Sequence, residues 1–503
     1  MNLRVPPFRF ILIGLLSSAI FACLSMIQND AQAAEPSKPD GHGMVVSVSA
    51  SGSEVGKDIL LKGGNAVDAA VATAFALAVT YPAAGNIGGG GFMMIYPGHG
   101  AEPVLIDYRE TAPVASTKTM FEKREGLFGH LVVGVPGTVR GLALAHQKFG
   151  KLPWKEVVEP AVRLAAKGFA MDANLANSLN GIVSNTKEYP ELQRVYGKKG
   201  KPSWEPGDRL IQTDLAITLQ SIADQGPDAF YKGDIADKIV SEMKSANGLI
   251  TKEDLIKYEA KARTPIHGTY RGYDIYGPPP PSSGGICLVE MLNILESFDL
   301  HKQGRWSTET VHLMIEAMRR AYCDRARYLG DADFVSIPSK LIAKEYAHEL
   351  AKGIDLKKAT RSEDLAKDIP LAKEGDSTTH FSVIDRNGMA VSNTYTLERS
   401  YGSRVVVKGA GFLLNDEMMD FNWKPGITNR NGSIGTAPNQ IAPGKRMLSS
   451  QTPTIVAKNG KAFLITGSPG SRTIINTVLG IVVNVIDFEM PIQEAVDAPR
   501  LHH

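Results

Sequence analysis

The spacing of hydrophobic and polar positions predicts layered secondary structure early in the chain. Residues 44–50, MVVSVSA, alternate as a half-buried strand does, and residues 53–64 predict a short helix that ends on a Gly-Gly pair. In residues 65–82, NAVDAAVATAFALAVTYP, small apolar residues cover most faces. We therefore expect a buried helix, with Asn65 as its N-cap and Pro82 beyond its end.

A run of glycines then leads into another strand. Residues 85–96, GNIGGGGFMMIY, could form a phosphate-binding loop, but no Gly-Lys-Ser/Thr follows and a strand comes next instead of a helix. Close packing of the backbone is the expected reason for the glycines. Residues 102–113, EPVLIDYRETAP, predict a further strand that ends near Arg109 and Glu110.

The pattern changes character at Thr378. Helices and loops dominate up to about residue 355, with a long helix at residues 310–329, whereas short strands dominate afterwards. The later strands are expected at residues 379–385, 390–396, 409–415, 452–458 and 461–468, before a helix at 474–487. This order predicts an α+β fold in which sheets pack between helical layers.

The join at Thr378 has an unusual composition. Residues 356–377 are dense in charge and poor in large apolar residues, which predicts a mobile, exposed segment. Residues 379–396 predict a β-hairpin with an Asn-Gly turn of type I′. Three hydroxyl residues, Ser377, Thr378 and Thr379, stand where the exposed segment meets the hairpin. Serine and threonine are also common at strand starts, so the feature is ambiguous by itself.

Composition narrows the class of protein. The chain has 503 residues, 43% hydrophobic and 21% charged, with a formal net charge of +2, which is ordinary for a folded globular protein. No basic cluster with interleaved aromatic residues is present, so nucleic-acid binding is not expected.

The N-terminus has the layout of a secretory signal peptide. Two arginines precede an apolar run at residues 11–27, and AQAA at residues 31–34 offers a cleavage site. We expect residues 1–33 to be removed, leaving a periplasmic or secreted protein with no stable membrane association. An uncleaved membrane anchor is the alternative. Lipid attachment at Cys23 is disfavoured, because bulky Phe21 stands where a small residue is needed.

Cysteine and histidine usage gives no sign of a metal site. Only Cys287 and Cys323 would remain after cleavage, which permits one disulfide at most, and we interpret them as small buried hydrophobic residues. His380 is isolated and reads as a packed or hydrogen-bonded histidine, and no ligand spacing for zinc is present. The order of serine, histidine and aspartate residues along the chain does not exclude a Ser-His-Asp triad, although no G-x-S-x-G motif occurs.

Thr378 fits the chemistry of an N-terminal nucleophile. A free α-amine beside a hydroxyl supplies the base that a weakly acidic alcohol lacks. That amine forms if the Thr378 hydroxyl attacks the carbonyl of Ser377, the acyl group moves from N to O, and water hydrolyses the resulting ester. The preceding exposed segment could then leave the site.

Three downstream segments could complete such a site. TGSPGSRTI at residues 466–474 could offer backbone N–H groups to an oxyanion, or could be an ordinary strand-to-helix turn. KRMLSSQTPT at residues 445–454 presents two serines. NDEMMDF at residues 415–421 carries Glu417 and Asp420, which could bind an ammonium group or could be surface acids.

Taken together, these motifs resemble the gamma-glutamyltransferases. The resemblance rests on DSTTHFSVID, LLNDEMMDF, KRMLSSQTPT, TGSPGSRTI, IGGGGFMMIY and IDYRETAP, and it runs from about Gly43 to the last residue in the family order. It implies the fold of the N-terminal-nucleophile hydrolases, a four-layer αββα sandwich. It also implies a precursor that cuts itself into a large subunit, residues 34–377, and a small subunit, residues 378–503, which together form one catalytic domain.

The resemblance also implies roles for individual residues. Thr378 matches the nucleophile, with Thr396 bonding its new amine, and Gly470 and Ser471 match the pair that forms the oxyanion hole. The matches for substrate binding are Arg109, Ser449 and Ser450 for the α-carboxylate, and Glu417 and Asp420 for the α-ammonium. An arginine suits a carboxylate because its planar fork donates two parallel hydrogen bonds.

The chain departs from the family pattern at three places. Ser471 replaces a glycine, which keeps the N–H but restricts the backbone. Glu398 stands where some members carry asparagine and others glutamate, so we interpret it as variation within the family that adds a third acid around the ammonium. The chain stops at APRLHH, where the family usually continues for several tens of residues. Missing C-terminal strands would expose a sheet edge, so either the C-terminal end is incomplete or the stability of the fold is reduced.

The implied activity is hydrolysis or transfer of the γ-glutamyl group of glutathione and related compounds, through an ester on Thr378. Water or an amino acid or peptide would accept the group, and no metal or organic cofactor would be needed. One alternative is an acylase of the same superfamily that cleaves glutaryl amides, which lack the α-ammonium. Glu398, Glu417 and Asp420 argue against it, because acids around an uncharged methylene would have no partner. A non-catalytic exported binding protein is the second alternative.

Overall fold

Two antiparallel sheets form the centre of the fold. The structure is a computed structural model that describes residues 41–122, 126, 128–366, 371–372, 378–422, 433–434 and 437–503. Residues 42–503 form one compact unit. The predicted signal peptide and Ser377 lie outside the described residues, as does part of the charged segment 356–377.

The larger sheet joins strands from both sides of Thr378. In the described part of the chain it has six strands, in the order β1-β10-β11-β2-β3-β6. The bounds are β1 Gly43–Val46, β10 Thr379–Asp385, β11 Ala390–Thr396, β2 Gly90–Tyr96, β3 Val104–Asp107 and β6 Lys261–Arg263. The two strands after Thr378 therefore lie between strands that precede it, and neither part of the chain forms this sheet alone.

The smaller sheet is built in the same mixed way. Its order is β14-β13-β8-β7, with β14 Lys461–Thr466, β13 Thr454–Lys458, β8 Tyr273–Gly277 and β7 Ile266–Tyr270. Two short strand pairs, β4 Phe169–Ala170 with β5 Arg209–Leu210 and β9 Leu371–Ala372 with β12 Ser433–Ile434, lie outside both sheets.

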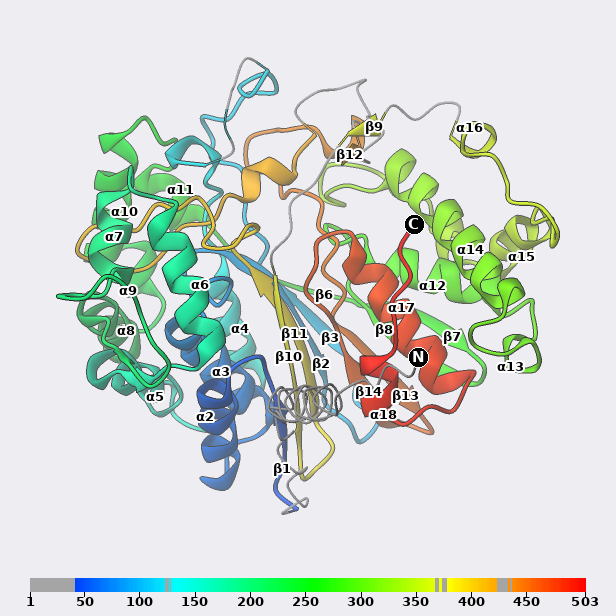
Figure 1. The fold of residues 1–503 in the computed structure, drawn as a ribbon, viewed down its shortest axis with the longest axis horizontal. Coiled ribbons are helices and arrows are strands. Elements are labelled where there is room, and N and C mark those ends of the chain that lie inside the picture. The colour runs from blue at the N-terminus through cyan, green and yellow to red at the C-terminus, as the bar shows by residue number, and fades with distance from the viewer. Residues whose placement is uncertain are drawn as a thin grey trace, which may run out of the picture. The chain divides into compact units, whose positions relative to one another are not determined.

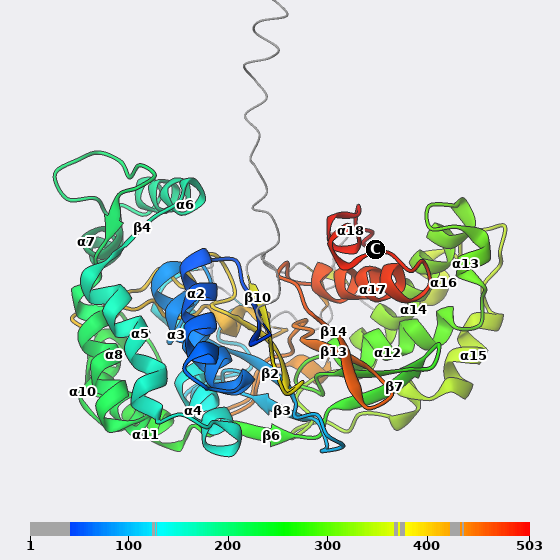
Figure 2. The ribbon, with the colours of Figure 1, turned by 90° about the horizontal axis from the view of Figure 1, so that it is seen from below.

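Helices cover the outer faces of both sheets, and Figure 2 shows the resulting order of helix, sheet, sheet and helix from left to right. The helices on the side of the larger sheet are α2 Ala50–Leu61, α3 Ala66–Thr80, α4 Thr138–Phe149, α5 Trp154–Lys167 and α8 Thr213–Gln225. On the side of the smaller sheet lie α12 Gly284–Leu295, α14 Thr308–Tyr328, α15 Lys344–Lys352, α17 Thr473–Ile486 and α18 Ile492–Asp497 (Figure 1). Shorter or peripheral helices are α6 Ala173–Ser184, α7 Pro190–Tyr196, α9 Asp228–Tyr231, α10 Asp234–Ser245, α11 Lys252–Lys257, α13 Leu300–Gln303 and α16 Ser362–Leu365. The predicted four-layer αββα architecture is confirmed.

Strand β2 shows how the layers are held together. Met93 and Ile95 belong to the hydrophobic core shared with the first helical layer, whereas Phe92, Met94 and Tyr96 belong to the core between the two sheets. Successive side chains of a strand point to opposite faces, so an uninterrupted apolar run suits a sheet that is buried on both sides. A third core lies between the smaller sheet and the helices outside it.

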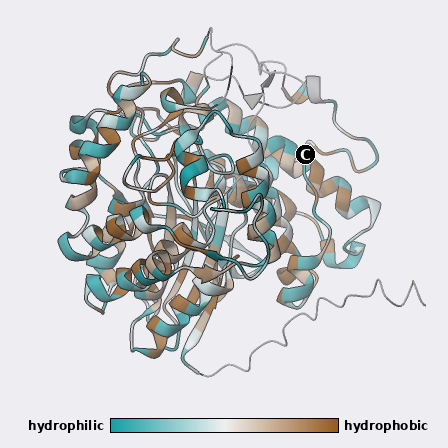
Figure 3. Cartoon of the chain, turned by 60° about the vertical axis from the view of Figure 1, so that its left-hand side comes forward, coloured by the Kyte–Doolittle hydropathy of each residue, from teal (hydrophilic) through white to brown (hydrophobic). Residues whose placement is uncertain are grey.

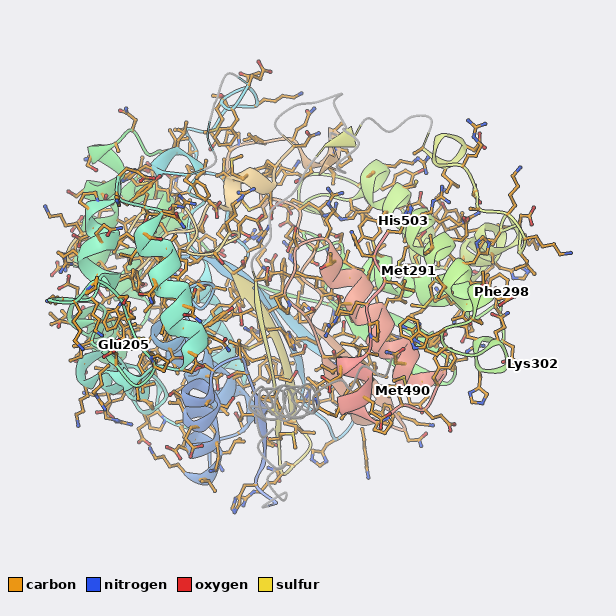
Figure 4. All side chains as sticks on the ribbon, viewed as in Figure 1. Glu205, Met291, Phe298, Lys302, Met490 and His503 are labelled. Atoms are coloured by element: carbon orange, nitrogen blue, oxygen red, sulfur yellow. The ribbon has the colours of Figure 1, made fainter. Side chains whose placement is uncertain are left out.

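The helical layers follow the sequence pattern. Helix α3 is buried along its whole length and has the predicted N-cap: the Asn65 side chain accepts the backbone N–H groups of Val67 and Asp68. Peripheral helices alternate hydrophilic and hydrophobic residues along their length (Figure 3), as helices that cover a core with one face do. In Figure 4, Met291 lies within buried helix α12, whereas Lys302 lies at the periphery.

The glycine run of residues 88–91 packs against other backbone, as predicted. A Cβ added to Gly88 would lie 2.1 Å from the Leu413 carbonyl oxygen, and one added to Gly89 would lie 2.0 Å from the Thr396 carbonyl oxygen. Only glycine allows these approaches, and they bring β2 against the segments that carry the candidate site.

Two local predictions were wrong. The β10–β11 hairpin forms, but φ is positive only at Gly388 of its turn, and the Gly388 N–H bonds the Asp385 carbonyl oxygen. A type I′ turn needs positive φ at two central residues. The Asp385 carboxylate accepts the Asn387 N–H at 2.8 Å, which favours the observed turn. The strand expected at residues 409–415 is a loop with only an isolated bridge between Val406 and Leu413.

The structure also bears on the predictions for His380 and the two cysteines. His380 is half-buried and hydrogen-bonded, as predicted: its ring nitrogens bond Thr394 Oγ1 at 2.9 Å and Ser382 Oγ at 3.0 Å. Among the described residues, Cys287 and Cys323 are not joined by a disulfide. Cys287 is buried as predicted, whereas Cys323 is only half-buried, contrary to the prediction. No helix in the described part of the chain combines the length and hydrophobicity needed to cross a bilayer.

Candidate active site

Thr378 lies directly before strand β10 and faces a small pocket. Its side chain is almost fully buried. The pocket is lined by Arg109, Thr378, Thr396, Glu398, Glu417, Asp420, Leu448, Ser449, Ser450, Gln451, Ser471 and Ile474. Every candidate site residue named from the sequence is in this set except Gly470, which precedes Ser471, and Ser377, which lies outside the described residues. The fold therefore brings together residues separated by more than three hundred positions.

The sheet positions the two threonines. Thr396 ends β11, the strand that pairs with β10, and its Oγ1 accepts the backbone N–H of Glu398 at 2.9 Å. The Thr396 carbonyl oxygen accepts the side-chain amide of Asn86 at 2.8 Å. Thr378 and Thr396 are thus held at the same end of a rigid hairpin. Glu398, two residues later, has a φ of +75°, a conformation that costs a residue with a side chain more than it costs glycine.

Arg109 is the centre of the charged part of the pocket. It follows β3, and its Nη1 and Nη2 donate to Glu417 and Asp420, respectively, while Nε donates to the Met447 carbonyl oxygen at 3.2 Å. The Arg109 side chain is 1% exposed and that of Glu417 is fully buried. The residues expected to bind a carboxylate and an ammonium are therefore direct neighbours.

The loop that carries the acids is held by buried polar contacts. Asn415 donates its side-chain amide to the carbonyl oxygens of Gly88 and Gly134, and its Oδ1 accepts the Glu417 N–H at 3.1 Å. Asp416 bonds the backbone N–H and the guanidinium of Arg399. These contacts fix the segment that carries Glu417 and Asp420, which directly follows residues 409–415.

Burial shifts the pKa values of the acids in this cluster upward. Desolvation raises the pKa of Glu417 and of Glu398 well above the usual range, and it outweighs the favourable charge of Arg109. For the same reason the pKa of neighbouring Glu110 is raised to about 8. Among the described residues, neither carboxylate oxygen of Glu110 has a hydrogen-bond partner, although Arg109 Nη1 lies 3.7 Å from Oε2.

Burial disfavours the charge on Arg109, but the surrounding carboxylates overcome this effect and raise the pKa of the guanidinium above its ordinary value. Arg109 therefore stays charged throughout the physiological range. The carboxylate oxygens of Glu398, Glu417 and Asp420 lie within 4.8 Å of one another, close enough to share one cation. An ammonium or a metal ion would satisfy that geometry, and the guanidinium beside it disfavours a divalent ion.

Ser449 and Ser450 also line the pocket. Ser449 Oγ accepts the backbone N–H of Gln451 at 3.1 Å, and Ser450 Oγ accepts Nη2 of Arg325, a residue of α14, at 3.0 Å. Gln451 is 2% exposed, and neither its amide nitrogen nor its amide oxygen has a partner among the described residues. Arg325 and Gln451 were not assigned a role from the sequence.

The turn between β14 and α17 offers its backbone to the pocket. Gly470 has a φ of +118° and Ser471 a φ of +51°, so the position where this chain replaces a glycine does adopt a left-handed conformation. The N–H groups of Gly470 and Ser471 have no acceptor among the described residues. On the other side of the turn Gly467 packs on His380, whose Nδ1 would lie 2.2 Å from an added Cβ.

A larger surface cavity of about 390 Å³ lies elsewhere, near α7 and the start of α8. Its lining includes Lys198, Trp204 and Gln212 but none of the candidate residues. We assign the chemistry to the smaller pocket because it alone, in the described part of the chain, combines Thr378 with the buried charges.

Comparison with known proteins identifies the family. The family model for gamma-glutamyltranspeptidase matches residues 52–503. The chain belongs to the gamma-glutamyltranspeptidase family. It is 47% identical over 508 residues to the glutathione hydrolase proenzyme of Escherichia coli (strain K12), which covers 96% of this chain and 87% of that protein.

Solved structures of two kinds share the fold. Helicobacter pylori gamma-glutamyltranspeptidase is 43% identical, with a TM-score of 0.64 over 66% of this chain and 97% of that one. The cephalosporin acylase of Bacillus halodurans is 28% identical, with a TM-score of 0.80 over 91% of this chain and 83% of that one. The family and the fold expected from the motifs are confirmed, and the chain is an enzyme of this family. The fold is shared with an acylase, so the fold alone does not determine the substrate; the side chains of the pocket do.

Proposed function

We propose that the chain is a precursor that cuts itself before Thr378 and then cleaves the γ-glutamyl amide of glutathione and related compounds. The observation that carries the proposal is the pocket itself, in which a hydroxyl at the start of a strand faces one buried guanidinium and three acids. A γ-glutamyl group carries an α-carboxylate, an α-ammonium and a γ-carbonyl, and the pocket has a complementary group for each.

Self-cleavage comes first. The Thr378 hydroxyl attacks the carbonyl carbon of Ser377, the C–N bond breaks as the C–O bond forms, and water hydrolyses the ester to leave a free α-amine. The products are residues 34–377 and 378–503. Both sheets combine strands from each side of the cut, so the two pieces would stay together as one catalytic domain. The proenzyme names of the curated relatives support this step.

The γ-glutamyl transfer then uses the new amine as general base. The amine of Thr378 takes the proton of its own hydroxyl, Oγ attacks the γ-carbonyl carbon, and the N–H groups of Gly470 and Ser471 bind the oxyanion. The proton passes to the departing amine of the substrate, leaving a γ-glutamyl ester on Thr378. Water or an amino acid or peptide attacks that ester, again after losing a proton to the amine.

Charge pairing binds the glutamyl end. Arg109, Ser449 and Ser450 bind the α-carboxylate, and Glu417, Asp420 and Glu398 bind the α-ammonium. In the structure Arg109 pairs with Glu417 and Asp420 themselves. A zwitterion can replace these bonds with its own two charges, so binding costs no unpaired buried charge. The reaction needs no metal or organic cofactor.

We further propose that the mature protein is periplasmic or secreted, after removal of residues 1–33. The layout of the N-terminal sequence supports this location.

The deciding experiment compares two anilides that differ only in the α-ammonium. The γ-glutamyl anilide is expected to be cleaved at least about a hundredfold faster, in kcat/KM, than the glutaryl anilide, because three acids would otherwise face a methylene. Equal rates for the two anilides would contradict the proposed ammonium site and favour the acylase alternative. Cleavage of neither compound by a protein that stays a single chain would favour the non-catalytic alternative.

A further inference from the structure

A chain of hydrogen bonds connects helix α14 to the serines of the pocket. Arg325 of α14 is 2% exposed, and its Nη2 donates to Ser450 Oγ at 3.0 Å while its Nε donates to Ser283 Oγ at 2.9 Å. Ser283 in turn donates from Oγ and from its backbone N–H to the Ser449 carbonyl oxygen, at 2.7 and 2.8 Å. Arg325 does not line the pocket itself.

These contacts decide where the hydroxyl protons point. An arginine side chain can only donate, so Ser450 Oγ must accept from Arg325 with a lone pair, and its proton points elsewhere. Ser449 Oγ accepts the Gln451 N–H in the same way. Among the described residues, neither hydroxyl donates to a protein acceptor, although both serines line the pocket.

We propose that Arg325 is a positioning residue that fixes Ser450 as a hydrogen-bond donor to the α-carboxylate of the γ-glutamyl substrate. The inference rests on the proposed function. Without Arg325, the Ser450 hydroxyl could rotate and offer a lone pair, which would repel a carboxylate. The preference for a substrate that carries the carboxylate therefore depends on Arg325, through Ser450.

The test compares two substrates that differ only in the carboxylate. One is a γ-glutamyl anilide, and the other is 4-aminobutyryl anilide, which keeps the ammonium and the scissile amide. The ratio of their kcat/KM values measures carboxylate recognition. Arg325→Met and Ser450→Ala should each lower the ratio about tenfold or more, as expected for one lost hydrogen bond to a charged group.

The double variant decides whether Arg325 acts through Ser450. If it does, Arg325→Met combined with Ser450→Ala lowers the ratio about as far as Ser450→Ala alone, since the interaction is already lost. Multiplication of the two single effects would overturn the proposal. The matched control is Arg320→Lys, at another buried arginine of α14 that bonds Glu316 and the Leu350 carbonyl oxygen. It should leave the ratio unchanged.

Folding is monitored by thermal unfolding and by self-cleavage. If Arg325→Met does not fold, Arg325→Lys is used, because lysine keeps the charge but cannot hold Ser450 and Ser283 at once. A wild-type ratio in a folded Arg325→Lys or Arg325→Met protein would overturn the proposal. If the wild-type enzyme cleaves no γ-glutamyl anilide, the proposed function fails. If the wild-type enzyme prefers the γ-glutamyl anilide over the 4-aminobutyryl anilide and Arg325→Met leaves that ratio unchanged, only the role of Arg325 is contradicted.

Discussion

Arg109 and Glu417 form a buried ion pair that joins the end of strand β3 to the loop after residue 414. Both side chains are excluded from solvent, at 1% and 0% exposure. A buried pair is costly to break from one side, because the remaining charge has no partner. In the proposed function a γ-glutamyl substrate separates these two residues, so we expect this pair to link the stability of the pocket to substrate binding.

Arg109→Lys should reduce kcat/KM for a γ-glutamyl anilide sharply. Lysine keeps the positive charge but cannot make two parallel bonds to a carboxylate. Losing one hydrogen bond to a charged group costs about 1.5–3 kcal/mol, which corresponds to roughly ten- to a hundred-and-fifty-fold in rate. The loss is measured by steady-state kinetics.

Self-cleavage is the internal control for that variant, because it involves no substrate. Arg109→Lys protein should still appear as two pieces on a denaturing gel. Wild-type kinetics in a properly cleaved Arg109→Lys protein would contradict the assignment of Arg109 to the carboxylate.

Glu110→Gln should change how stability depends on pH. The folded-state pKa of about 8 lies above the usual value of 4.5, because the carboxyl is buried beside other acids. Stability from the neutral carboxyl is fully present below about pH 4.5, and it declines as the pH rises toward 8 because the unfolded chain loses the proton more readily. The glutamine variant lacks this decline.

The difference in Tm between Glu110→Gln and wild type should therefore shift in favour of the variant between pH 5 and pH 9. Any cost of placing an amide there is independent of pH and cancels in the comparison. Parallel stability curves would show that Glu110 is already ionised in the folded protein at pH 5.

The sequence predicted the architecture well because its signals are local and repeated. The apolar residues of helix α3, the alternation in the hairpin strands and the glycine run each indicate which residues are buried, within a window of about fifteen residues. The hairpin turn was mispredicted because the side chain of Asp385 competes with the Asn-Gly preference. The prediction of a strand at residues 409–415 was wrong because its apolar residues pack into the core as a loop, without a neighbouring strand to pair with.

The pocket, by contrast, could not be predicted from local sequence signals. Arg109, Glu417 and Thr378 were grouped by resemblance, since nothing local brings residues so distant in sequence together. Arg325 stands in a long amphipathic helix with several other arginines, and no sequence pattern separates it from them. Gln451 could have been noticed as the residue after the two serines. Its buried, unpartnered amide becomes visible only in three dimensions.

Ser471→Gly should retain activity within about threefold of wild type and should not lower the Tm. The role proposed for this residue uses only its backbone N–H, which glycine keeps. A φ of +51° costs a serine about 1–2 kcal/mol that glycine avoids. Steady-state kinetics and thermal unfolding measure both effects. A large loss of activity would mean that the Ser471 hydroxyl takes part in the reaction.

Chelation should leave activity intact. The carboxylates of Glu398, Glu417 and Asp420 are close enough to hold a cation, but in the proposed function they bind the substrate ammonium. Protein dialysed against EDTA should hydrolyse a γ-glutamyl anilide at the rate of undialysed protein. A loss that zinc or magnesium restores would replace the ammonium site with a metal site.

N-terminal sequencing of the purified protein tests the central claim most directly. The wild-type chain should give two pieces on a denaturing gel, and Edman degradation of the smaller should read Thr-Thr-His, from Thr378, Thr379 and His380. Thr378→Ala should remain a single chain, because the attacking hydroxyl is gone. A smaller piece that begins at any other residue, or a Thr378→Ala protein that still cleaves, would contradict the assignment of Thr378 as the nucleophile.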